Sequence, residues 1–182
     1  HVLLLVGRAG CGKSTFVDYL REVALPEDLE EGTIWSHVDL NSAPVDSDRI
    51  YDWVTDQIIN DLREKSDLDF DKLENIETLY NVEVNKLKKG RLKRFEEGSR
   101  EYNRIVDEKI KELENDRDKK LNAYFRFMGA QQEKAPIVVM DNADKRSKEE
   151  QLLMFEVSRW LRSKFRCVVV LPIRDETYDF YK

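Results

Sequence analysis

The residue types most suited to chemistry lie close together near the start of the chain. Three glycines, a lysine and two hydroxyl side chains occur in the segment Gly7-Arg8-Ala9-Gly10-Cys11-Gly12-Lys13-Ser14-Thr15. Glycine adopts backbone conformations closed to other residues, so such a loop can turn its N–H groups toward an anion. We expect Lys13 to bridge the β- and γ-phosphates of a nucleoside triphosphate, Ser14 to place its hydroxyl on Mg²⁺ and Thr15 to lie near the α-phosphate.

The segments on either side of this loop have the patterns needed to position it. Val2 to Val6 is a short apolar run, typical of a strand buried on both faces. Beyond the loop, apolar residues recur at helical spacing from Lys13 to Ala24, and Pro26 closes this helix. A helix that begins at the loop adds partial positive charge at its N-terminus. The nine residues 7–15 are therefore the candidate binding loop for a phosphate-containing ligand.

The remaining strands and helices alternate along the chain. The sequence predicts strands at Thr33–Leu40, Pro136–Met140 and Cys167–Leu171, and helices starting near Ser47 and covering residues 147–165. Alternation of this kind favours a parallel sheet built from right-handed crossovers. The expected fold class is therefore α/β with a mostly parallel sheet.

Composition narrows the functional classes. The chain has 31 basic and 37 acidic side chains, and 37% of its residues are charged, above the roughly 25% usual for globular proteins. Two cysteines, Cys11 and Cys167, are too few and too far apart for a disulfide framework or a cysteine zinc site. No apolar run reaches the roughly 18 residues needed to cross a bilayer. We expect a cytoplasmic protein without a membrane partner.

The middle of the chain differs from the rest in charge. Residues 86–126 carry 14 basic and 9 acidic side chains, whereas residues 1–85 carry 7 basic and 19 acidic ones. A basic excess could follow nucleic-acid phosphates. The basic residues are expected to alternate with Glu and Asp, however, which favours a solvated helix of mixed charge. Residues 99–126 alone would form a helix of about 42 Å, so we expect residues 67–130 to be a charged helical hairpin or coiled-coil-like insertion.

With these elements, the chain resembles the P-loop NTPase superfamily. Residues 7–14 match the Walker A motif of that superfamily, and the apolar strand Ile137-Val138-Val139-Met140-Asp141 resembles its Walker B motif. The resemblance implies a three-layer sandwich formed by residues 1–66 and 131–182, with the helical insertion between them. It also implies that Asp141 helps to hold Mg²⁺, and that the ligand is ATP. The core is expected to be incomplete at its C-terminal end, without the lid that usually follows.

The order of elements resembles the ASCE branch, which has an extra strand between the Walker A and Walker B strands. Within it, the chain looks most like STAND and AAA+-type ATPases. This resemblance implies that Asp144 orients or deprotonates the attacking water and that Arg174 senses the γ-phosphate. Asn142 stands where many AAA+ proteins place a catalytic glutamate, so the resemblance leaves the rate of hydrolysis open.

Two functions are compatible with these features. One is an ATPase that acts as a regulatory switch in a larger signalling or defence protein, including antiviral defence, through self-association or contacts with other domains. The other is a nucleotide-stabilised scaffold with little turnover, whose helical insertion binds a protein or a nucleic acid. Motifs of other classes, such as the guanine-reading Asn-Lys-x-Asp and the metal-binding His-Glu-x-x-His, do not occur in the sequence.

Overall fold

The computed structural model describes residues 1–65, 69–70 and 72–181. Its strands are β1 (Val2–Val6), β2 (Thr33–Asp39), β3 (Ala135–Asp141) and β4 (Val168–Ile173). Its α-helices are α1 (Lys13–Tyr19), α2 (Glu27–Glu31), α3 (Ser47–Lys65), α4 (Leu73–Leu79), α5 (Asn81–Lys89), α6 (Arg100–Asn115), α7 (Arg117–Gln131), α8 (Lys148–Phe165) and α9 (Asp175–Tyr181). A π-helical turn, η1 (Leu20–Ala24), extends α1, and short 3₁₀ turns lie at η2 (Leu40–Ser42), η3 (Arg91–Arg94) and η4 (Ala143–Lys145).

The strands form a four-stranded sheet in the order β1-β4-β3-β2, with all neighbouring pairs parallel. The prediction of an α/β fold with a parallel sheet is thereby confirmed. The register pairs Val6 with Ile173 and Asp39 with Asp141. The carboxyl ends of the strands therefore meet at one edge of the sheet, and the loops that follow them are neighbours.

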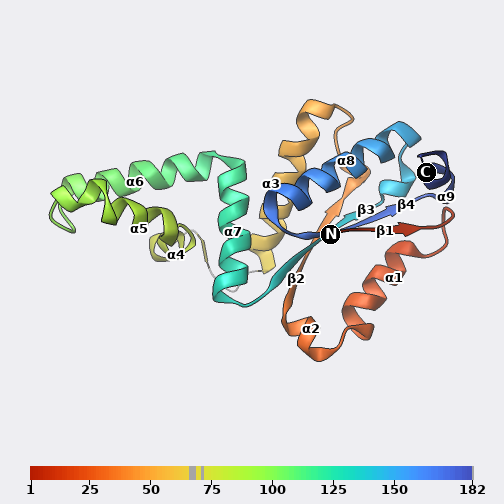
Figure 1. Cartoon of the computed structure of the whole chain (residues 1–182), viewed down its shortest axis with the longest axis horizontal. Coiled ribbons are helices and arrows are strands. Elements are labelled where there is room, and N and C mark those ends of the chain that lie inside the picture. Colours follow the sequence, from red (N-terminus) through yellow and green to blue (C-terminus); the bar gives the residue numbers. More distant parts are fainter. Residues whose placement is uncertain (66–68, 71, 182) are drawn as a thin grey trace.

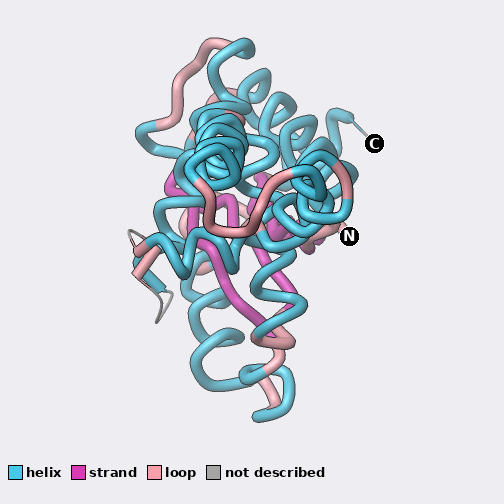
Figure 2. Tube along the Cα trace, turned by 90° about the vertical axis from the view of Figure 1, so that its left-hand side faces the viewer, coloured by secondary structure: helices cyan, strands magenta, loops and turns pink. Residues whose placement is uncertain are grey.

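Helices lie on both faces of the sheet, but they cover the two faces unequally. On one face α3, α7 and α8 pack against the strands, and α1 and α2 lie on the other (Figure 1; Figure 2 shows the molecule from the side of the projecting helices). The face below α3, α7 and α8 belongs to a large core that includes Val138, Met140, Val169 and Leu171. The face below α1 has a small cluster in which the buried members are Val17, Val139 and Val170.

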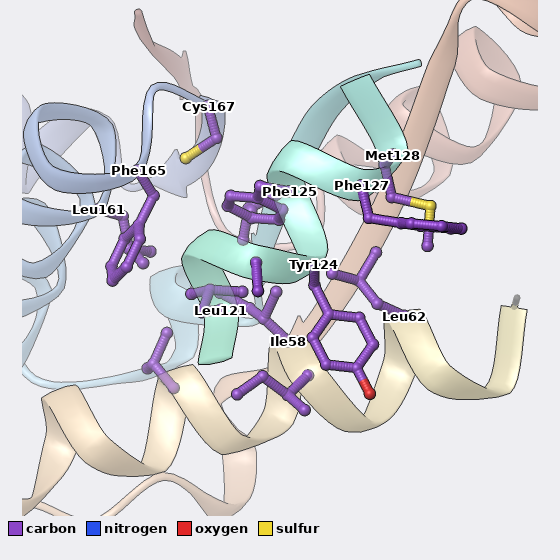
Figure 3. Packing of buried hydrophobic residues seen from close by; sticks show 14 of the residues in the cluster. Ile58, Leu62, Leu121, Tyr124, Phe125, Phe127, Met128, Leu161, Phe165 and Cys167 are labelled. Carbon is purple, nitrogen blue, oxygen red and sulfur yellow. The ribbon is translucent and has the colours of Figure 1, made fainter. Parts of the chain in front are cut away.

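The segment predicted as a helical insertion divides into two parts. Helices α4, α5 and α6 project away from the sheet, whereas α7 packs against α3, β3 and α8 (Figure 1). Leu121, Tyr124 and Met128 of α7 are almost completely buried beside Ile58 and Leu62 of α3 (Figure 3). The large core thus extends into residues 67–130, the segment predicted to be the helical insertion. The predicted boundary between residues 66 and 67 lies outside the described residues.

Residues 99–126 do not form one continuous helix. The chain leaves α6 at Asn115 and starts α7 at Arg117. Between them, the extended residue Asp116 accepts a hydrogen bond from the backbone N–H of Lys119 and so caps α7. This break allows α6 to project while α7 stays on the core.

Within residues 1–65, 69–70 and 72–181, no helix is both long and apolar enough to span a bilayer.

Candidate functional site

The loop between β1 and α1 lies at the carboxyl edge of the sheet. The N–H of Gly7 donates to the carbonyl of Ile173 at 3.3 Å, which ties the start of the loop to the end of β4. Gly10 and Gly12 have φ values of +72° and +87°, in the left-handed region that residues with a side chain rarely adopt. A Cβ atom on Gly7 would lie 2.8 Å from the sulfur of Cys11. The three glycines therefore allow a turn that other residues would strain or block.

Lys13, the first residue of α1, is the buried member of this loop. Its side chain folds back so that Nζ lies 2.9 Å from the carbonyl oxygens of both Gly7 and Arg8. The same ammonium group lies 2.8 Å from Oδ2 of Asp144, and the two side chains are only 7% and 14% exposed. An ammonium group has three N–H donors. The hydrogen-bond acceptors of Lys13 are the two carbonyl oxygens and, more weakly, the sulfur of Cys11 at 3.8 Å, while Asp144 is its ion-pair partner, so another anion would compete with contacts that Lys13 already makes.

Ser14 and Asp141 meet across 127 residues of sequence. The Ser14 hydroxyl donates to Oδ1 of Asp141 at 2.6 Å. On its other oxygen, Asp141 lies 3.2 Å from Nε2 of His37, which projects from the adjacent strand β2. The hydrogen bond with His37, helped by those from Ser14 and the backbone of Asn142, lowers the pKa of Asp141 to about 2 against the opposing effect of burial. In return, the hydrogen bond with Asp141 raises the pKa of His37 above its ordinary value. Asp141 is therefore a carboxylate at neutral pH.

Asn142 points toward β2. Its backbone is left-handed, with a φ of +62°, and its amide group donates to Oδ1 of Asp39 at 2.7 Å. Burial raises the pKa of Asp39, but hydrogen bonds from the Asn41 backbone and the Asn142 amide outweigh it and lower that pKa. The residue after Asp141 is thus an amide bound to a neighbouring strand.

Arg174 directly follows β4, and the adjacent residue Ile173 bonds to Gly7. The backbone N–H of Arg174 donates to Oε1 of Gln151 at 3.2 Å. Its Nε atom is buried and has no hydrogen-bond partner among the described residues. The backbone at Arg174 is therefore next to the loop, while its guanidinium group has an unsatisfied donor.

The structure brings together four of the predicted site residues, Lys13, Ser14, Asp141 and Asp144, through the contacts given above. The other side chains of the loop are open to solvent; they belong to Arg8, Ala9, Cys11 and Thr15. Arg8 lies 3.8 Å from Asp175 in an exposed ion pair. Sequence reasoning missed His37 and Asp39 as parts of the site. The pairing of β2 with β3 places both beside the Asp141 segment, and a single sequence does not contain that pairing.

The donor set at this edge suits a hard cation. Among the described residues, no group of three or more His, Cys, Asp or Glu side chains could hold a metal ion by itself. Mg²⁺ in phosphate sites does not need such a cage, since it usually takes one or two protein oxygens and completes its shell with water and phosphate. The Ser14 hydroxyl and the Asp141 carboxylate supply two oxygens 2.6 Å apart. The residues present fit Mg²⁺.

Comparison of the chain with protein-family models, with curated proteins and with solved structures gave no match.

Proposed function

We propose that this chain is a P-loop NTPase that binds Mg²⁺-ATP at residues 7–15 and hydrolyses it slowly as part of a regulatory switch. The observation that carries the proposal is the meeting of the Gly7–Ser14 loop with Asp141 and Asp144. A glycine-rich turn alone could be structural. A buried lysine and a serine that both contact carboxylates after a distant strand are expected of a site for a phosphate group and its cation.

The sheet order supports the same assignment. Strand β4 lies between β1, which leads into the loop, and β3, which ends at Asp141. An additional strand between these two is what the ASCE resemblance implies. The loop and the Asp141 segment then lie at the same edge of the sheet, although the strands that they follow are not adjacent. Both therefore lie at the carboxyl ends of the strands, where ligands bind in open α/β sheets.

Phosphate binding would reorganise the contacts of Lys13. The N–H groups of the loop and of the first turn of α1 would bind the phosphate oxygens. The Lys13 ammonium would exchange at least one acceptor, Asp144 or a loop carbonyl, for the terminal phosphate. Ser14 and Asp141 would hold Mg²⁺, which when bound offsets the negative charge that builds up on the phosphates.

The residues that would promote hydrolysis are Asp144 and Arg174. Once Lys13 has left it, the Asp144 carboxylate is free to orient a water molecule or accept its proton. The unsatisfied Nε donor of Arg174, one residue beyond the strand that bonds to Gly7, is suited to a phosphate oxygen. The amide at Asn142 cannot accept a proton from water as a glutamate would, which favours slow turnover.

A nucleotide-stabilised scaffold with little turnover is the second candidate. The specific observation that favours it is the hydrogen bond from the Asn142 amide to Asp39, because it occupies this position with a group that does not act as a base. In this case ATP would stabilise the fold without being consumed.

Steady-state ATP hydrolysis, measured with the Lys13→Ala variant, tests the proposal. Lys145→Ala is a matched control, because Lys145 is an exposed lysine in the turn η4 that contains Asp144. We expect ATP binding and turnover to be lost in Lys13→Ala and kept in Lys145→Ala. Binding without turnover would favour the scaffold. Absence of binding at millimolar ATP in folded wild-type protein would refute both functions.

A further inference from the structure

The projecting helices end in a tip that is held in place by its own packing. Helices α5 and α6 lie side by side and run antiparallel, and residues 90–99 connect them at the end farthest from the sheet (Figure 1). Within this connection, Leu92 of the 3₁₀ turn η3 is only 2% exposed. It belongs to the same buried cluster as Val84 of α5 and Tyr102 and Val106 of α6. The tip therefore has a packed interior that fixes where its surface side chains start.

The surface of this tip is strongly basic. From Lys86 to Arg94 the chain has six basic residues and no acidic one, and all six are exposed; they are Lys86, Lys88, Lys89, Arg91, Lys93 and Arg94. We call these six residues the basic tip. The expectation that basic residues of the middle segment alternate with Glu and Asp is wrong for this stretch, since its six charges form a block.

The basic tip differs from the rest of the segment in its lack of partners. Lys88 lies 3.2 Å from Glu97, but in the part of the chain that the structure describes the other five have no carboxylate within ion-pair distance. By contrast, six of the eight basic residues of α6 and α7 form ion pairs, and within the described residues only Arg100 and Lys111 have no carboxylate at that distance. Lys109 contacts Glu112, Lys120 contacts Glu114, and Arg126 contacts Glu83. Five neighbouring cations without counter-charges repel one another, so an anion that binds across them relieves this repulsion.

We propose that the basic tip binds the phosphate backbone of a nucleic acid, without reading its sequence. A duplex carries one negative charge per roughly 1.7 Å of its axis, so one short stretch presents as many charges as the tip does. Arg91 and Arg94 add planar forks that suit phosphate oxygens. The rest of the chain has 25 basic and 37 acidic side chains, so the tip's distance from the sheet keeps a polyanion away from an acidic body.

The apolar surface at the tip argues against a membrane as the partner. Phe95, next to the basic tip, is 38% exposed, while Leu92 is buried. Stable attachment to a bilayer requires a larger buried apolar face in addition to positive charge. Phosphate contacts require none, so the observations favour a nucleic acid.

The test measures binding of fluorescent 20-base-pair DNA and RNA duplexes of arbitrary sequence by anisotropy between 50 and 300 mM salt. With five or six phosphate contacts, log affinity for the DNA duplex should fall against log salt with a slope of about −4.5 to −5.4. The variant Lys89→Gln/Arg91→Gln/Lys93→Gln should make that slope shallower by about 2.7. It should also weaken binding at 100 mM salt about 100-fold or more.

Two further variants keep this test specific. Lys89→Arg/Lys93→Arg preserves the charge and should bind like wild type. Lys111→Gln/Arg159→Gln/Arg162→Gln removes the same charge from exposed positions outside the tip, and its affinity should change less than threefold. Circular dichroism of each variant verifies folding. Binding should also survive Lys13→Ala, so this inference and the proposed ATP site can fail separately.

Three results would overturn the inference. One is the absence of duplex binding at 50 mM salt, and another is an equal loss of affinity in the two glutamine variants. The third is tighter binding to vesicles with 30% phosphatidylserine or to polyglutamate than to either duplex, which would assign the tip to a different partner.

Discussion

Replacing Asp144 by asparagine should strengthen ATP binding while it reduces turnover. The Asp144 carboxylate would compete with a bound phosphate for Lys13, since the two side chains form an ion pair at 2.8 Å that is largely shielded from solvent. Asparagine has nearly the same shape and no charge. The substitution therefore weakens the contact that holds the Lys13 ammonium group and leaves that group more available to a phosphate. It also removes a negative charge that would face the phosphate.

The magnitude follows from the geometry of the pair. Asp144 lies 2.8 Å from Lys13 Nζ, so a phosphate oxygen on the far side of that ammonium group would lie about 6 Å from the carboxylate. Two unit charges about 6 Å apart interact with roughly 3 kcal/mol at an effective dielectric constant of about 20. Solvent that enters with the ligand screens part of this. We therefore expect a net gain of about 1–2 kcal/mol, or roughly 5- to 30-fold in affinity.

Calorimetry with a non-hydrolysable ATP analogue and with ADP measures this effect. The gain should be smaller for ADP, because it lacks the phosphate that would face Asp144. Asp175→Asn is the matched control, since it removes the same charge from an exposed pair 3.8 Å from Arg8 and should change affinity less than about twofold. An Asp144→Asn protein that binds the analogue no better than wild type would refute competition for Lys13.

Three other changes probe the scaffold around the site. Leu121→Ala should lower the free energy of unfolding by about 2–5 kcal/mol in denaturant titrations, because it leaves a cavity where a fully buried side chain joins α7 to the core. Ser147→Ala should cost about 1 kcal/mol in thermal melts, since it removes one half of the capping box with Glu150 that starts α8. His37→Gln should destabilise the ligand-free protein most near pH 5. Because the pKa of His37 is raised in the folded state, its protonation stabilises the fold. This contribution is complete below pH 6.5 and is lost as the pH rises through the raised pKa. Because the pKa of Asp141 is lowered in the folded state, its ionisation stabilises the fold above pH 3.8, and this contribution is lost as the pH falls toward 2.

The sheet could be predicted from the apolar runs of its strands, and most securely at the central strands. The expectation that Val2–Val6 is buried on both faces is wrong, because β1 lies at the edge of the sheet and leaves Leu3 52% and Val6 42% exposed. Val138, Val139 and Met140 are at most 2% exposed, so they form the continuous apolar run typical of a central parallel strand. The glycine-rich turn between β1 and α1 could be predicted for a local reason as well. Its glycines, lysine and serine are adjacent in sequence, and the turn at Gly10 and Gly12 depends on those residues themselves.

The contacts between distant segments could not be predicted in the same way. Asp144 meets Lys13, and His37 meets Asp141, because of the order and register of the strands. The break between α6 and α7 was missed because Asp116 ends the helix by capping the next one, with no Gly or Pro to mark it. The spacing of apolar residues predicted α7 as a helix but did not indicate that it packs on α3.

The unequal cover of the sheet has a consequence for the loop. Of the α1 residues, Lys13 and Val17 are buried, so Val17 supplies most of the buried apolar contact between this helix and the strands. Detachment of α1 from the sheet should therefore cost far less free energy than unfolding the molecule. Two polar contacts help to hold α1 in place, the Lys13–Asp144 ion pair and the Ser14–Asp141 hydrogen bond. A ligand that breaks these contacts must replace them with contacts of its own, so binding of the ligand and the order of α1 are thermodynamically linked.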